Sequence, residues 1–228
     1  PATHPIDADG LAVIPGLIES HTHVDASLFW DPHATQSAQH GVTTVLGGFC
    51  GFALAPVVPD HLEYLQEMFA SVEGMPVEAL RQGVPWNWNS FAEYLDCLTG
   101  RIGVNAGFFA GHEAIRRMVI GRDFTRHAQP AEIEAMQEQL RQCLQAGALG
   151  FSSSRSFSHM DGDGVPVASC HAHEDETTAL CQVLSDCPGT GIEFITDGCL
   201  RQLSDDEMQL MIRMSRVAGG RPLNWNVL

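Results

Sequence analysis

Six short apolar segments, separated by longer stretches with helical patterning, constrain the fold of this chain most strongly. Most of them are followed by a polar or glycine-containing turn, and they lie at residues 13–18, 42–47, 103–110, 149–153, 192–196 and 223–228. Strands that alternate with helices favour βα units and a parallel sheet. The sequence therefore predicts an α/β fold.

The stretches between the apolar segments carry start and stop signals of helices. Ser90 and Ser204 each precede a glutamate by three residues, which is the capping-box pattern. Residues 131–146 are amphipathic and are followed by Gly147, a typical C-terminal glycine.

A closed (β/α)8 TIM barrel needs eight strands and about 250 residues. We therefore expect about six βα units of a TIM-barrel-like fold, as an incomplete fragment.

The composition excludes several classes of protein. The chain has 228 residues, 44% of them hydrophobic, so it can bury a sizeable core. A net charge of −16 argues against a nucleic-acid or anionic-membrane partner. No apolar run reaches the ~20 residues of a membrane span. The seven scattered cysteines indicate reduced thiols in a cytoplasmic protein.

The chain has no lysine, because all twelve basic residues are arginines. A Schiff-base lysine is therefore excluded as a nucleophile of this chain. A carboxylated lysine that bridges two metal ions is excluded for the same reason.

His21 and His23 follow the apolar stretch 11–18 and are separated by one residue. Residues i and i+2 of a strand point to the same face, so two imidazoles would enter one space. Neutral imidazole is a common metal ligand. The alternative is a polar pair on a solvated loop, but the buried strand predicted before the pair favours a metal site.

Other candidate residues follow the next strands, where barrels carry their functional groups. Cys50 follows the second strand, His112 the third and Arg155 the fourth. Zinc accepts thiolate and imidazole together, so Cys50 is a candidate ligand beside the histidine pair. The alternative for Cys50 is a small buried residue.

A second cluster, at residues 170–174, also contains cysteine and histidine. A structural zinc needs four ligands at defined spacing, which this stretch lacks. We interpret it as a solvated entry to the helix that follows.

Several motifs resemble those of the amidohydrolase superfamily, and specifically of its D-aminoacylase (N-acyl-D-amino-acid deacylase) branch. They lie at residues 15–25, 29–32, 40–45, 49–56, 86–88, 94–96, 111–112 and 147–152. The His-x-His pair is shared by the whole superfamily. Cys50, followed by Gly51 and the nearby Pro56, is more specific to this branch.

This resemblance implies a zinc-dependent hydrolase of linear amides, with one or two zinc ions and a small-molecule N-acyl amino acid as substrate. His21 and His23 match the paired metal histidines, and Cys50 matches the cysteine ligand of the branch. Residues 1–12 would be the remnant of a small N-terminal β domain, and 13–228 a hydrolase barrel that is incomplete at its C-terminus.

The resemblance also implies histidine ligands on strands five and six and a catalytic aspartate on strand eight. The predicted strands at 192–196 and 223–228 contain no histidine. Either these ligands lie beyond Leu228 or the metal site is partly lost, and the aspartate is expected beyond this chain.

In such a mechanism zinc activates water, and the aspartate transfers its proton to the leaving amine. His112 would hydrogen-bond the substrate or the oxyanion, or else be a structural histidine. Arg155 would pair with the substrate carboxylate, or else form a surface salt bridge. Cyclic-amide or isopeptide hydrolysis and a non-catalytic barrel remain alternatives.

Overall fold

Parallel strands in a continuous row form the centre of the protein. The structure is a computed structural model that describes residues 4–225. Its seven strands are β1 (Leu17–Glu19), β2 (Val42–Gly47), β3 (Asn105–Phe108), β4 (Ala110–Gly111), β5 (Gly150–Arg155), β6 (Gly191–Thr196) and β7 (Leu223–Trp225). Every described pairing between them is parallel.

The strands divide formally into a β1-β2-β3 sheet and a β4-β5-β6-β7 sheet. Only Phe109 separates β3 from β4, and its N–H donates to the carbonyl of Gly47, at 3.0 Å. This strand therefore passes from pairing with β2 to pairing with β5 at a single residue. The result is a curved parallel sheet of six strand positions, as the sequence predicted, and the TIM-barrel-like α/β expectation is confirmed.

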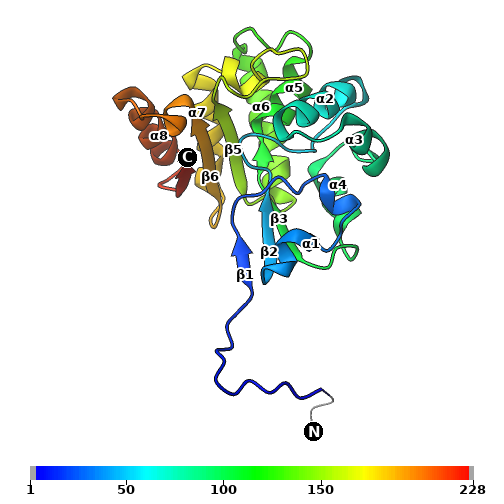
Figure 1. Cartoon of the computed structure of the whole chain (residues 1–228). Helices are drawn as coiled ribbons and strands as arrows, with labels where there is room; N and C mark the ends of the chain where they lie inside the picture. Colours follow the sequence, from blue (N-terminus) through cyan, green and yellow to red (C-terminus); the bar gives the residue numbers. More distant parts are fainter. Residues whose placement is uncertain (1–3, 226–228) are drawn as a thin grey trace.

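Eight α-helices lie around the strands in the described part of the chain (Figure 1). They are α1 (Thr35–Gln39), α2 (Leu62–Glu73), α3 (Val77–Gly83), α4 (Phe91–Leu98), α5 (His112–Ile120), α6 (Pro130–Gln145), α7 (Glu174–Val183) and α8 (Asp205–Val217). No helix in residues 4–225 is long and apolar enough to cross a membrane.

Local sequence signals explain several helix ends. Ser90 and Ser204 both form complete capping boxes, at the starts of α4 and α8. The predicted helix 131–146 is α6, and Gly147 after it has a left-handed φ of 109°. Residues 75–88, between α2 and α4, are not one continuous loop, because α3 forms within them.

The first apolar segment differs most from its prediction. Only Leu17–Glu19 pair as a strand, and Val13 and Ile18 are 88% and 64% exposed. The prediction of a buried strand here is wrong, because β1 pairs with β2 alone among the described strands and leaves its other edge open. Residues 4–16 lead to it as an extended segment without a strand (Figure 1).

The last predicted strand begins at its predicted first residue, Leu223. β7 covers Leu223–Trp225, and the remainder of the predicted 223–228 lies outside the described residues. The small β domain expected at residues 1–12 stays a prediction.

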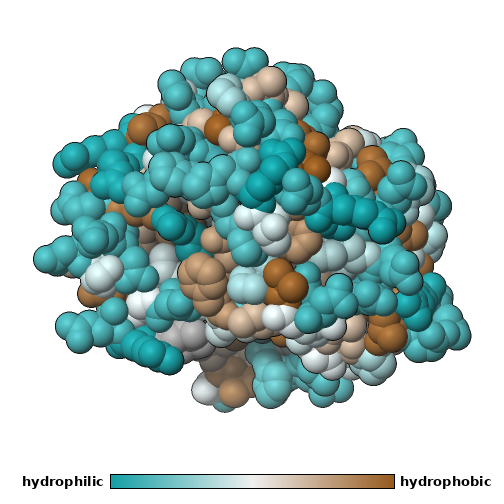
Figure 2. Space-filling model, turned by 90° about the horizontal axis from the view of Figure 1, so that it is seen from above, coloured by the Kyte–Doolittle hydropathy of each residue, from teal (hydrophilic) through white to brown (hydrophobic). Residues whose placement is uncertain are grey.

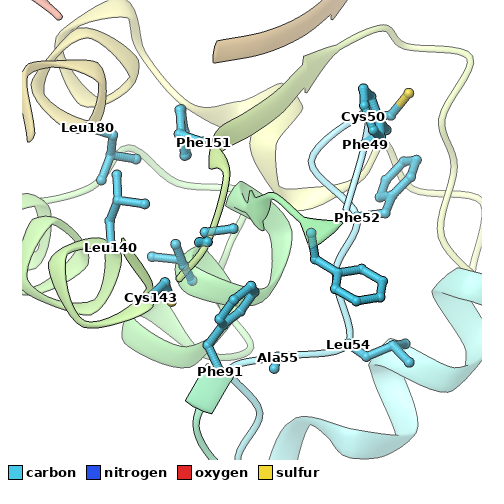
Figure 3. Packing of buried hydrophobic residues seen from close by; sticks show 14 of the residues in the cluster. Phe49, Cys50, Phe52, Leu54, Ala55, Phe91, Leu140, Cys143, Phe151 and Leu180 are labelled. Atoms are coloured by element: carbon cyan, nitrogen blue, oxygen red, sulfur yellow. The ribbon is translucent and has the colours of Figure 1, made fainter. Parts of the chain in front are cut away.

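The core lies between the sheet and the helices. Figure 3 shows Leu140 of α6 and Leu180 of α7 close to Phe151 of β5, and these three side chains are fully buried. Burying a side chain of this size stabilises the fold by about 1.5–3 kcal/mol. Helices α6 and α7 therefore hold β5 in place, and with it the residues at its carboxyl end.

Candidate metal centre

His21, His23 and Cys50 converge at the carboxyl end of the first two strands. The histidines follow β1 and the cysteine follows β2, and these strands are parallel neighbours. Their ligand atoms all lie within 4.8 Å of one another, and this is the only such group among the described residues. The Cys50 Sγ and His21 Nε2 atoms are 3.6 Å apart.

This geometry fits a zinc ion. Zinc binds histidine nitrogen at about 2.0–2.1 Å and cysteine sulfur at about 2.3 Å, so neighbouring ligand atoms of a tetrahedral site are about 3.3–3.8 Å apart. The observed Sγ–Nε2 distance of 3.6 Å falls in that range. Two imidazoles and a thiol are also ligand types that zinc prefers.

The backbone at Cys50 is held in an uncommon conformation. Its φ of +56° is left-handed, which non-glycine residues rarely adopt. The Cys50 N–H donates to Glu193 Oε2 at 2.7 Å, and Glu193 is fully buried on β6. A strand far along the chain thus fixes the turn that presents the thiol.

Strand β5 supports the same turn. The Gly51 N–H donates to Ser152 Oγ at 3.2 Å. A Cβ atom on Gly51 would lie 3.2 Å from the Cα of Ser153, and its φ is +82°. Glycine is therefore required where the turn after β2 packs against β5.

Burial keeps two of the candidate ligands, His23 and Cys50, neutral without a metal. Burial, aided by His21 and His159, lowers the pKa of His23 to about 4, so its ring nitrogens are uncharged at pH 7. Burial and then the Glu193 carboxylate raise the pKa of the Cys50 thiol. A bound cation stabilises the thiolate, so Cys50 would ionise when zinc binds.

Two carboxyl groups lie beside the histidines, the partly buried Glu73 and the buried Asp25. Glu73 Oε1, at the end of α2, is 3.1 Å from His23 Nδ1, a close contact whose angle falls outside hydrogen-bond geometry. Burial, with a contribution from Asp25, raises the pKa of Glu73 to about 8, so the pair is neutral at pH 7. Burial also raises the pKa of Asp25 to about 7. A metal cation nearby would make their ionised forms less costly.

His112, the candidate substrate-binding residue after the third strand, lies in a buried polar network. Its side chain is 0% exposed. Its Nδ1 is 2.8 Å from Ser153 Oγ and its Nε2 is 2.9 Å from Glu176 Oε1. Arg116 Nε also lies 2.9 Å from that glutamate oxygen. These contacts favour the structural alternative, and the substrate contact of His112 stays a prediction.

Arg155, the second candidate substrate-binding residue, ends β5. Its guanidinium lies 3.8 Å from Glu174 Oε1. The pocket around it is also lined by Asp197, Asp206 and Glu207. Four carboxylates disfavour an anionic substrate, so this setting favours the salt-bridge alternative.

The second cysteine–histidine cluster has structural contacts. The Cys170 thiol donates to the carbonyl of Ser156, and His173 accepts from the Asp175 N–H at the start of α7. This placement agrees with its interpretation as a helix entry.

Three residues near the candidate metal centre were not singled out from the sequence: Glu73, His159 and Glu193. Only Glu193 carried a usable signal, since a glutamate inside an apolar strand is rarely buried without a partner. The other two lie in a helix and in a loop, where polar residues are ordinary.

Figure 2 views the molecule from above, where the carboxyl ends of the strands lie, and shows a paler, partly apolar centre surrounded by hydrophilic residues. The aromatic rings of Phe49 and Phe52 lie beside the histidines at this end, 4.2 Å from His21 and 6.2 Å from His23 between ring centroids. The cluster thus lies where parallel α/β folds carry their active sites.

Comparisons with known proteins agree with this fold. Residues 5–226 match the amidohydrolase family, to which the chain belongs. It is similar to the D-aminoacylase of Alcaligenes xylosoxydans xylosoxydans, with 33% identity over 181 residues, which are 79% of this chain and 33% of that protein. It is also similar to the N-acyl-D-aspartate deacylase of the same organism, with 35% identity over 189 residues, 81% of this chain and 33% of that protein.

A solved structure of a D-aminoacylase, described with a binuclear metal centre, superposes with a TM-score of 0.66 at 29% identity. The match covers 92% of this chain and 39% of that one. The chain thus spans about one third of the length of the curated relatives it matches.

Proposed function

We propose that this protein is a zinc-dependent hydrolase of linear amides, and that its reaction is the deacylation of N-acyl-D-amino acids. The convergence of His21, His23 and Cys50 within 4.8 Å carries the proposal. The similarity to a D-aminoacylase and to an N-acyl-D-aspartate deacylase supports the substrate class, including the D configuration.

The chain's own residues would prepare the site in three ways. His23 offers an uncharged ring nitrogen, His21 offers a second imidazole beside it, and Cys50 offers a thiol that ionises on binding zinc. Glu73 would orient His23 from the side of Nδ1. Glu193 would hold the backbone that presents Cys50. Bound zinc lowers the pKa of its water to about 7 and polarises a carbonyl oxygen.

The cysteines and the net charge of the chain support a small-molecule substrate and a reducing compartment. The seven cysteines are scattered along the sequence, which supports reduced thiols and a cytoplasmic location. The net charge of −16 disfavours nucleic acid as a partner.

A non-catalytic relative is the second candidate, and one observation favours it. Strands β6 and β7 carry no histidine within their described residues, whereas the family resemblance implies ligands on strands five and six. Such a protein would keep the barrel and lose part of its metal site.

Metal analysis combined with an amidase assay separates the two. The protein, purified at its natural length, should contain zinc and release acetate from N-acetyl-D-amino acids. His23→Ala should lower both zinc content and turnover, whereas His40→Ala, at an exposed histidine after α1, should change neither. Full zinc content and full activity in His23→Ala would refute the ligand assignment, and absence of zinc from the unmodified protein would favour the second candidate.

A further inference from the structure

His159 is a third imidazole close to the candidate metal centre. It lies in the loop after β5, and its ring centroid is 5.0 Å from that of Phe52. The same phenylalanine ring lies 6.2 Å from the ring of His23. His159 is also close enough to His23 to lower the pKa of that residue. Phe52 is thus a common ring neighbour of His23 and His159.

The hydrogen bonds around Ser154 favour one position for the ring proton of His159. Ser154 Oγ, fully buried at the end of β5, accepts the N–H of Ser156 at 3.1 Å. It lies 2.9 Å from His159 Nδ1. Cys170 Sγ is a second neighbour of this hydroxyl, but sulfur is a weak acceptor. A hydroxyl proton donated to Nδ1 places the proton of the neutral ring on Nε2, and this is the tautomer that the inference uses.

The Nε2 atom is available to a ligand. Among the residues that the structure describes, none is a hydrogen-bond partner of this nitrogen, and the side chain keeps partial exposure. Burial lowers the pKa of His159, although Asp197 opposes the shift, so the ring is neutral at pH 7. The ligand atoms that gather within 4.8 Å come from His21, His23 and Cys50, and His159 is outside that group. The position of His159 therefore suits a hydrogen-bond donor to a molecule bound at the metal better than it suits a metal ligand.

We propose that the Nε2–H of His159 donates a hydrogen bond to the carbonyl oxygen of the scissile amide. This inference rests on the proposed amide hydrolysis. When water adds to the carbonyl carbon, the C=O π electrons move to this oxygen, which becomes an oxyanion and accepts the same hydrogen bond more strongly. The proton stays on Nε2 throughout. His159 would thus fill the role that the sequence offered for His112.

Two variants separate the effect of the His159 N–H donor from the effect of its ring. His159→Phe keeps a ring and removes the N–H, whereas His159→Gln keeps a side-chain N–H donor. Calorimetry measures the affinity of each protein for zinc, and then the affinity of the zinc-loaded protein for methylphosphonate, a tetrahedral anion. We expect unchanged zinc affinity in both variants. Methylphosphonate affinity should fall about 10- to 100-fold in His159→Phe and recover in part in His159→Gln.

The outcomes separate this inference from the function on which it rests. Unmodified protein that binds no zinc contradicts the proposed function. Normal zinc binding with wild-type methylphosphonate affinity in His159→Phe contradicts the donor. A loss of zinc affinity in His159→Phe makes His159 a ligand and also overturns the proposal. If that variant does not fold, nitrogen-15 NMR of the unmodified protein decides, because a proton on Nδ1 rather than Nε2 contradicts the argument.

Discussion

Removing the carboxylate of Glu176 should destabilise the protein severely. Glu176 on α7 is 1% exposed, and it contacts two fully buried groups, the His112 ring and the Arg116 guanidinium, each at 2.9 Å. Glu176→Ala leaves that guanidinium as a buried charge without its counterion. The protein must then either expose the arginine or keep the charge in a low-dielectric interior.

The cost can be worked from these contacts. Removing one partner of a buried ion pair lowers the free energy of unfolding by about 3–5 kcal/mol. An unpaired Nε2 of His112 adds to this, while Arg116 keeps its hydrogen bonds to the carbonyls of Phe124 and Arg126, at 3.0 and 2.8 Å. We therefore expect a loss of about 3–5 kcal/mol, a large share of the about 5–15 kcal/mol that stabilises a typical domain.

Urea unfolding followed by circular dichroism measures the loss, and Glu174→Ala is the matched control. Glu174 is on the same helix, but its side chain is 42% exposed, and it pairs with Arg155 and Arg213 at the surface. Its removal should cost at most about 1 kcal/mol. Equal effects of the two substitutions, or a loss below about 1 kcal/mol in Glu176→Ala, would refute the buried network.

Two further predictions concern other carboxylates. Glu73→Gln should weaken zinc binding about 10- to 100-fold by removing the carboxylate beside His23, whereas Glu63→Gln, exposed on the same helix, should leave it unchanged in a zinc titration. Burial raises the pKa of Glu207, but hydrogen bonds from Ser204 and its neighbours outweigh it and hold this pKa at about 2. The ionised form therefore stabilises the fold above its ordinary pKa of 4.5. Solvent screening at this partly exposed site limits the contribution to at most about 1 kcal/mol, and it is lost as the pH falls through about 2. Urea unfolding should show Glu207→Gln less stable than the unmodified protein at pH 7 and equally stable near pH 2, and a constant difference between the two would contradict this.

The architecture and the ligand cluster were predictable because both follow from strand order. The segment 42–47 became β2 with the predicted bounds. Parallel strands end at the same edge, so residues that follow neighbouring strands meet there. His21, His23 and Cys50 meet in this way, although β1 itself is short and exposed. The apolar run before His21 indicated a strand. It could not show that this strand, β1, pairs on one side only among the described strands.

The contacts that place the other polar residues were not predictable. Cys50 and Glu193 are 143 residues apart in sequence, and no local pattern joins them. His112 follows a strand just as Cys50 does, but it is the first residue of α5, and its ring nitrogens face Ser153 and Glu176. The path of the loop after β5 has no periodicity, so the place of His159 depends on its contacts in the folded chain.

X-ray absorption spectroscopy of the zinc-loaded protein tests the metal centre most directly, because sulfur and nitrogen ligands lie at different distances from zinc. We expect one sulfur ligand together with imidazole nitrogens, and we expect the sulfur signal to disappear in Cys50→Ala. A spectrum without sulfur, or a sulfur ligand that persists in Cys50→Ala, would contradict the convergence of His21, His23 and Cys50 on one cation.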